Sequence, residues 1–230
     1  MIKYENIVSA KFLDRPNRFI ALAEISGHIE KAHVMNTGRC RELLIPGTDI
    51  FLQQHDDPKR KTKYSLITVR KGGQLVNLDS QVPNALAAQM ALQGCFLPEP
   101  VFVKREKTYG DSRFDIYCES GNRKMFIEVK GVTLEENGVA RFPDAPTERG
   151  IKHMRGLIDA LADGYETALV FIIQMKGVAS FEANVRTQPE FARVLLEAKE
   201  AGVMVKAFDC IVTENSIAVD SEIPVKYIQV

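Results

Sequence analysis

Two acids and a lysine fall at a spacing that could build a divalent-metal site. Asp115 lies in the run 112–118, and Glu128 and Lys130 lie in the run 125–131; both runs alternate apolar and polar residues as strands do. Every second side chain of a strand shares a face, so Glu128 and Lys130 project together. Two carboxylates and a lysine converging on one point have the composition of a divalent-cation site with a charged helper.

The register of this hairpin decides whether the two acids meet. A four-residue loop over 120–123 puts Asp115 directly opposite Glu128, with Cβ atoms about 5 Å apart. A two-residue loop puts Asp115 opposite Phe126 instead, with Glu128 diagonal. Two carboxylates at this distance repel each other unless a cation lies between them or one of them is protonated. The alternation also predicts that Phe114 faces the apolar side. The alternative is an outer hairpin face with ordinary solvated charges.

The composition is that of a globular protein. The chain has 230 residues, of which 45% are hydrophobic and 26% charged, enough for one large or two small domains. No apolar run approaches the roughly 18 residues that a membrane span needs, and the first residues lack an apolar signal core. We therefore expect a cytoplasmic protein without a membrane association.

Cysteine spacing and charge exclude some classes of partner. The four cysteines are widely separated and form no CxxC pair, which argues against a zinc cluster. The net charge is zero, but residues 1–82 hold 13 lysines and arginines against 9 aspartates and glutamates. Global charge gives no strong nucleic-acid signal, while a basic patch on the first part stays open.

Residues 1–82 read as an all-β domain. Five or six short strands with regular turns suit a small barrel, and an OB-like β-barrel that binds nucleic acid is the natural candidate. The runs that we expect to form its strands cover 7–13, 19–25, 29–34, 48–54, 64–70 and 75–78.

Two loops of this domain are candidate nucleic-acid contacts. The turn 36–39 could hold a phosphate through its amides and Arg39, with Asn36 shaping it, or it could be a structural turn. The loop 56–63 is strongly basic and could track a nucleic-acid backbone, or simply be solvated. Its cations are Lys59, Arg60, Lys61 and Lys63.

Residues 83–230 read as a mixed sheet flanked by helices, so the chain is a two-domain α+β or α/β protein. Helices are expected at 83–92, from about 147 to 164, and from 189 to 201. Residues 132–141 are expected to form a loop or a brief strand, and residues 211–230 a short hairpin or edge extension. The remaining strands are expected at 101–107, 168–174 and 203–208, beside the hairpin above.

The segment 142–150 opens the second helix and could support the acidic hairpin. Asp144 or Thr147 can cap the helix, and Arg149 could clamp a phosphate at its positive end, beside Glu148. His153 could also reach the site, although a single helical histidine is usually structural.

A further acid precedes the hairpin. Glu106 could complete a metal shell, or it could equally pair with Arg113.

The order α-β-β-β-α-β, with Asp115 on the second strand and Glu128-Val129-Lys130 on the third, resembles the PD-(D/E)XK nuclease core, here with Phe114 before the first acid. The whole chain is similar to the sugar fermentation stimulation protein A family. The matching stretches are VMNTGR at 34–39, EKTYGDSRFD at 106–115, IEVKGVTL at 127–134 and FPDAPTERG at 142–150.

The resemblance implies an N-terminal OB-like domain, a C-terminal nuclease-like domain, DNA binding, nuclease activity on DNA or RNA, and a link to regulation of sugar (maltose) metabolism. In such a nuclease Asp115, Glu128 and the Val129 carbonyl would hold Mg²⁺ or Mn²⁺, and Lys130 would orient the attacking water or stabilise the phosphate. A homodimer is compatible with this organisation. The competing interpretations are a DNA-binding regulator without turnover, and a barrel module that binds a sugar or an oligonucleotide.

Overall fold

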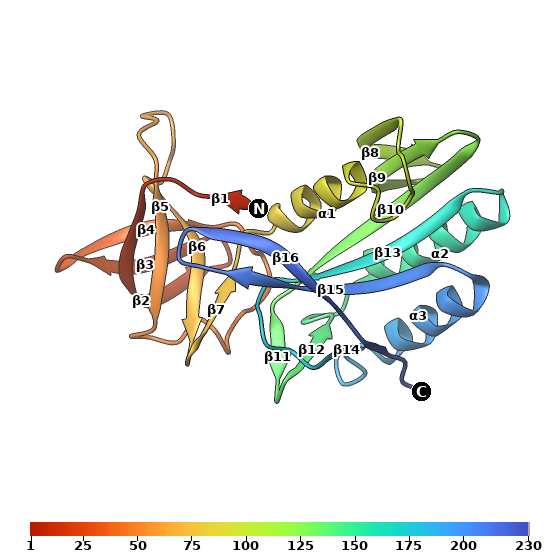
Figure 1. Cartoon of the computed structure of the whole chain (residues 1–230). Coiled ribbons are helices and arrows are strands. Elements are labelled where there is room, and N and C mark those ends of the chain that lie inside the picture. The colour runs from red at the N-terminus through yellow and green to blue at the C-terminus, as the bar shows by residue number, and fades with distance from the viewer. Residues whose placement is uncertain (230) are drawn as a thin grey trace.

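The computed structural model describes residues 1–229 and has two lobes. A barrel of red to orange strands lies at the left of Figure 1, and a larger sheet with helices lies at the right. Both predicted domains are therefore present, and one of the two connections between them is the segment between β7 (Gln74–Asn77) and α1 (Val82–Leu92). Within the described residues, no helix is both long and apolar enough to cross a membrane.

The barrel is a closed sheet of five strands with a sixth at its margin. Strand β4 pairs in parallel with β6, with Ala32 opposite Tyr64, and this pairing closes the ring. Small interior residues such as Ala21 and Ala23 face large ones such as Phe12, all buried, which fills a narrow barrel without voids. Its strands are β2 (Ile7–Asn17), β3 (Ile20–Ile25), β4 (His28–Val34), β5 (Asp49–Gln54), β6 (Tyr64–Lys71) and the marginal β7 (Gln74–Asn77).

The second domain is built on a seven-stranded mixed sheet in the order β1-β16-β15-β13-β10-β9-β8. Helix α1 packs on one face, while α2 and α3 pack on the other, so two apolar layers sandwich the sheet. This confirms the predicted mixed sheet flanked by helices. Its elements are α1 (Val82–Leu92), β8 (Phe102–Tyr109), β9 (Ser112–Ser120), β10 (Arg123–Val132), α2 (Glu148–Ala162), β13 (Glu166–Ile173), α3 (Pro189–Ala201), β15 (Met204–Val212) and β16 (Ser216–Ile223).

A small second sheet lies beneath the main one and goes beyond the sequence prediction. It has the order β11-β12-β14-β17 and is assembled from the β11–β12 hairpin and two strands distant from it in the sequence. These strands are two to four residues long, too short for alternation of apolar and polar residues to be recognised. They are β11 (Leu134–Glu136), β12 (Val139–Phe142), β14 (Ser180–Ala183) and β17 (Val225–Lys226).

The first strand, β1 (Ile2–Lys3), corrects the expectation that residues 1–82 form one domain. It pairs antiparallel with β16, with Ile2 opposite Ile217, at the edge of the large sheet. Tyr4 is buried in the layer that contains α1. The chain thus starts in the second domain and only then enters the barrel, because these two strand residues find their hydrogen-bonding edge there.

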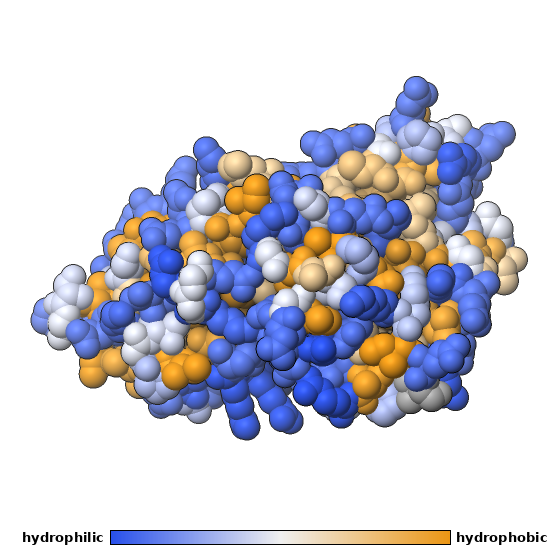
Figure 2. Space-filling view, turned by 60° about the horizontal axis from the view of Figure 1, so that its bottom comes forward, coloured by the Kyte–Doolittle hydropathy of each residue, from blue (hydrophilic) through white to orange (hydrophobic). Residues whose placement is uncertain are grey.

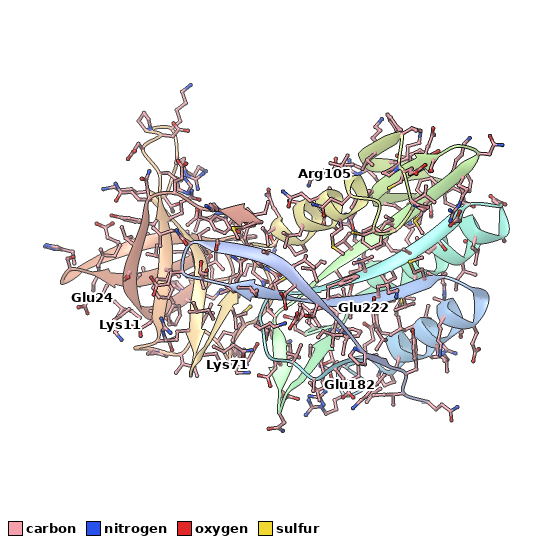
Figure 3. The ribbon with its side chains drawn as sticks, viewed as in Figure 1. Lys11, Glu24, Lys71, Arg105, Glu182 and Glu222 are labelled. Atoms are coloured by element: carbon pink, nitrogen blue, oxygen red, sulfur yellow. The ribbon has the colours of Figure 1, made fainter. Side chains whose placement is uncertain are left out.

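Polar contacts join the lobes at several points. Gln174 of the second domain donates to the carbonyls of Asn77 and Asp79 at 3.0 and 2.9 Å, in the segment that leaves the barrel. Lys71, at the lower end of the barrel in Figure 3, lies 2.6 Å from a carboxylate oxygen of Glu135 in β11. On the underside shown in Figure 2, apolar residues form small separate areas on a hydrophilic surface.

Candidate functional site

The hairpin β9–β10 adopts the register that brings the two acids together. Strand pairing runs from Ser120 opposite Arg123 to Ile116 opposite Ile127, so Asp115 and Glu128 are the next pair in line. The turn contains only residues 121 and 122, because Ser120 and Arg123 still pair. The four-residue loop is therefore too long, while the register predicted with it is correct.

The two strands separate just beyond this point, and Asp115 fills the fork. In a continuous ladder the amide of Val129 would donate to the backbone of Phe114, but it donates instead to Oδ2 of Asp115 at 2.8 Å. Because the N–H and C=O of one strand residue point to the same side, the Val129 carbonyl also faces this gap. The fork exposes the end of one strand to a ligand.

Phe114 does not face the side that alternation predicts. Its ring lies 5.3 Å from the ring of Phe126 and 6.2 Å from that of His153, centroid to centroid, in the layer under α2. Ile116 lies in the opposite layer, with α1. Phe114 and Ile116 thus point to opposite faces, because β9 departs from regular alternation at Asp115.

Glu128 is the most deeply buried member of the site, with 2% of its surface exposed. Its Oε1 accepts hydrogen bonds from Nζ of Lys130, at 2.5 Å, and from Nδ1 of His153. Its Oε2 is buried and has no hydrogen-bond partner among the described residues. Buried polar oxygens are nearly always paired, so this oxygen is open to a water molecule or a cation.

The electrostatics of the two acids diverge. Burial, and then the neighbouring Glu128 carboxylate, raise the pKa of Asp115 above its usual value. Burial alone would also raise the pKa of Glu128, but the hydrogen bond from His153 and the charge of Lys130 outweigh it and lower that pKa. A cation between the acids would stabilise the ionised form of both.

Helix α1 holds Asp115 from the other side. Nδ2 of Asn84, in the first turn of this helix, donates to Oδ1 of Asp115 at 2.8 Å. Both carboxylate oxygens of Asp115 therefore have one donor each, and each retains a lone pair. The side chain is fixed by the fork on one side and by the helix on the other.

The donor set fits a hard divalent cation. No group of three or more histidine, cysteine, aspartate or glutamate side chains within residues 1–229 is placed to bind a metal. Mg²⁺, however, is commonly bound through one or two carboxylates, with waters and substrate phosphates completing its shell. Asp115, the free Oε2 of Glu128 and the Val129 carbonyl supply that kind of incomplete oxygen shell.

Two of the other acids lie outside this cluster. Oε2 of Glu106 lies 3.7 Å from Nη1 of Arg113, and 61% of each side chain is exposed. Of the two roles considered for Glu106, the structure thus shows the ion pair with Arg113. Glu148 is an exposed first-turn residue of α2 that accepts a hydrogen bond from Gln188 at 3.4 Å.

Arg149 lies at the edge of the site. The side chain is exposed, and its Nε lies 3.4 Å from Nε2 of His153. Arg149 also lines a groove of about 510 Å³ along α2, together with Lys152 and Ser112.

Asp144 and the turn 36–39 contact each other across the two domains. Thr147 caps α2, accepting from the Gly150 amide at 3.0 Å, so Asp144 is not the cap. Instead, Oδ2 of Asp144 accepts the Arg39 amide at 3.2 Å.

Two amides of the turn 36–39 already have acceptors. The Gly38 amide donates to Oδ1 of Asn36 at 2.8 Å, and the Arg39 amide donates to Asp144. Arg15 holds the same turn from the barrel side, donating to the carbonyls of Asn36, Gly38 and Arg39 at 2.7 to 2.9 Å. The expectation that the amides of this turn hold a phosphate is therefore corrected for Gly38 and Arg39, because both amides already donate to side-chain oxygens. The Arg39 side chain stays exposed.

The basic loop connects β5 and β6, and its cations are exposed. Arg60 turns back onto the barrel, where its guanidinium donates to Oγ of Ser65 at 2.9 Å. Lys63 lies 5.5 Å above the ring of Tyr64. Lys59 and Lys61 extend into solvent. This loop and the acid cluster belong to different domains.

Sequence reasoning gave two supporting residues too little weight. His153 is only 5% exposed and contacts Glu128 directly. Its position on the buried stripe of α2, four residues after Arg149, was a signal in the sequence that it points toward the site. Asn84 had no signal beyond its place at a helix start. Both act through contacts between elements distant in the sequence.

A closed OB barrel followed by a mixed sheet with helices on both faces defines the class of this protein. Family models agree, matching residues 13–78 as the SfsA N-terminal OB domain and residues 81–216 as the sugar fermentation stimulation protein RE domain. The chain belongs to the sugar fermentation stimulation protein family.

Known relatives cover nearly the whole chain. A sugar fermentation stimulation protein homolog of Clostridium beijerinckii is 55% identical over 216 residues, 94% of this chain and 96% of that one. A homolog of Desulfitobacterium hafniense is 55% identical over 99% of this chain and 100% of its own length. The solved structure of Pyrococcus furiosus SfsA in complex with Ca²⁺ matches with a TM-score of 0.89 at 30% identity, covering 98% of both chains.

Proposed function

We propose that the protein is a divalent-metal-dependent phosphodiesterase that acts on nucleic acid. The observation that carries this proposal is the buried, unpartnered Oε2 of Glu128, next to Asp115 and Lys130. The Ca²⁺ complex of the related Pyrococcus furiosus protein supports a divalent cation in this fold. Mg²⁺ or Mn²⁺ is the cation proposed for activity, because both prefer oxygen ligands.

In this mechanism the chain's residues divide the work. Asp115, Glu128 and the Val129 carbonyl would hold the cation, which supplies Lewis-acid stabilisation of the scissile phosphate and a more acidic water. The Lys130 ammonium has three N–H donors and uses one on Glu128, so it can direct the others at a phosphate oxygen or the attacking water. Lys130 is partly exposed, at 14%, so substrate can reach it.

The barrel supplies the surface for the nucleic acid in this proposal. OB folds bind oligonucleotides between the loop joining their first two strands and the loop joining the last two. In this barrel the first of these loops ends at Phe19, which is 44% exposed with Arg18 stacked 4.9 Å from its ring. The second is the basic loop with Lys59, Lys61 and Lys63. Stacking on an aromatic ring beside backbone-tracking cations is the pattern of single-strand binding.

A cleavage assay tests the activity. Purified protein is incubated with single- and double-stranded DNA and RNA in Mg²⁺, Mn²⁺ or EDTA, beside Glu128→Gln and Lys130→Met. The control is Glu200→Gln, which changes the same chemical group at an exposed position of α3. We expect metal-dependent cleavage in the wild type and the control and a loss of at least about 100-fold in the other two variants. Binding without cleavage in every condition would favour a non-catalytic DNA-binding regulator.

A further inference from the structure

The imidazole of His153 connects the buried carboxylate of Glu128 to the surface of α2. Its Nδ1 contacts Oε1 of Glu128, and its Nε2 lies 3.4 Å from Nε of Arg149. The ring is 5% exposed and packs edge-on against Phe114 at 6.2 Å. Each ring nitrogen therefore has one partner, and the ring plane is fixed by packing.

The partners define the tautomer of this histidine. The Nε of an arginine can only donate a hydrogen bond, so Nε2 of His153 must accept. The proton then lies on Nδ1 and is donated to Glu128, whose ionised carboxylate only accepts. Arg149 thus sets which nitrogen of His153 carries the proton, from four residues earlier on the same helix.

Two donors on a single carboxylate oxygen leave the other oxygen free. Oε1 of Glu128 accepts hydrogen bonds from both Lys130 and His153, while Oε2 is buried and has no partner within residues 1–229. We infer that His153 is a positioning residue that turns Oε2 of Glu128 toward the cation, with Arg149 fixing its tautomer. This inference rests on the proposed function, since it assigns Glu128 as a cation ligand. Residues that hold a metal-binding side chain in this way typically change metal affinity about 10- to 100-fold when replaced.

Two near-isosteric variants separate positioning from packing. In His153→Asn the amide nitrogen can occupy the place of Nδ1 and still donate to Glu128. In His153→Gln the amide reaches the place of Nε2, so it can accept from Arg149 but no longer donates to Glu128. Both variants lose the packing of the ring on Phe114. A residue that only fills space would make the two variants alike.

The measurement is Mn²⁺ affinity by calorimetry or electron paramagnetic resonance, without nucleic acid, beside the control His28→Asn at the exposed start of β4. We expect the wild type, the control and His153→Asn to agree within about threefold, and His153→Gln to bind about 10- to 100-fold more weakly. Arg149→Leu, at an exposed position, should weaken Mn²⁺ binding at least threefold with its melting temperature unchanged. If cleavage is measurable, the loss in His153→Gln should be in kcat more than in KM.

Equal Mn²⁺ affinity in all variants would overturn the inference, as would equal losses in His153→Asn and His153→Gln. Unchanged affinity in Arg149→Leu would overturn the part assigned to Arg149. A wild type that binds Mn²⁺ with the expected variant pattern and never cleaves nucleic acid would contradict the proposed function alone, leaving the role of His153 intact.

Discussion

A carboxylate oxygen of Asp144 accepts a hydrogen bond from the backbone amide of Arg39 at 3.2 Å, so a loop of the second domain is hydrogen-bonded to a turn of the barrel. The contact is close-packed. A Cβ added to Gly38 would lie 2.5 Å from Oδ2 of Asp144 and 2.8 Å from Oδ1 of Asn36. A side chain at this position would therefore displace the two side-chain oxygens that accept hydrogen bonds from the turn.

Gly38→Ala should separate these groups and destabilise the protein by about 1–3 kcal/mol, the usual cost of forcing atoms into a packed site. Urea unfolding followed by tyrosine fluorescence measures the change. The control is Gly73→Ala in the β6–β7 turn, where an added Cβ meets no atom within 4 Å. If Gly38→Ala proves as stable as the control, the domain contact is looser than described.

The ion pair between Lys71 and Glu135 should make the domain contact sensitive to pH. Burial alone would raise the pKa of Glu135, but the hydrogen bonds from Lys71 and the Gly138 amide lower it overall. A carboxyl whose pKa is lower in the folded state stabilises the fold above its unfolded pKa of about 4.3, and this contribution disappears as the pH falls through the folded pKa.

Lys71→Gln should therefore reduce the free energy of unfolding by about 1 kcal/mol at pH 7 and by much less at pH 3. The measurement is urea unfolding at the two pH values. Lys206→Gln, which breaks a pair with Glu222 inside the second domain, is the control for losing one lysine. If Lys71→Gln changes the free energy of unfolding equally at both pH values, the ion pair with Glu135 is not the source of the pH dependence.

The basic loop of the barrel should contribute salt-sensitive affinity for single strands. Replacing Lys59, Lys61 and Lys63 together with glutamine should lower the slope of log affinity against log salt by about 2, since each phosphate contact contributes about 0.7. Anisotropy of a labelled oligonucleotide in EDTA, across a potassium chloride series, provides the measurement. Neutralising the same number of lysines in the second domain (Lys199, Lys206 and Lys226) should leave the slope unchanged. Equal slopes in the two triple variants would place the nucleic acid elsewhere.

The hydrogen bond from Asn84 to Asp115 should support cation binding. Asn84→Ala removes the donor at Oδ1, so the carboxylate keeps only the Val129 amide to orient it. We expect Mn²⁺ affinity to fall about tenfold, as for other residues that orient a ligand side chain. Gln89→Ala in the same helix controls for the change in helix composition. Unaltered Mn²⁺ affinity would mean that the fork alone holds Asp115.

The sequence predicts much of this fold because the larger elements carry clear periodic patterns. The barrel strands, the three helices and the central hairpin were recognised to within a few residues. Requiring that the apolar faces of both strands be buried together left two registers for the hairpin, and the structure adopts the one that places Asp115 opposite Glu128. Alternation failed at Phe114 because the strands part there, and a fork has no signature in a single strand.

The supporting contacts of the site depend on packing between distant elements, which a pattern along one segment does not contain. His153 meets Glu128 only after α2 has docked on the sheet, and Asp144 meets Arg39 only after the two domains have joined. The charges of the turn 36–39 suggested an anion site, yet Asp144 itself supplies the anion. The acids and the lysine were recognisable because they share one hairpin.

The pairing of Ile2–Lys3 with β16 means that the backbone passes between the domains twice, once after β1 and once after β7. A single linker would let the lobes swivel freely, whereas two covalent tethers limit them to motion about the line that joins the crossings. During synthesis, β1 must wait for residue 217 before it can pair, so this second connection is fixed only after the barrel strands have been made. Deleting the first three residues would therefore remove the pairing of β1 with β16 and leave the lobes joined by the segment after β7 and by contacts such as that between Asp144 and Arg39.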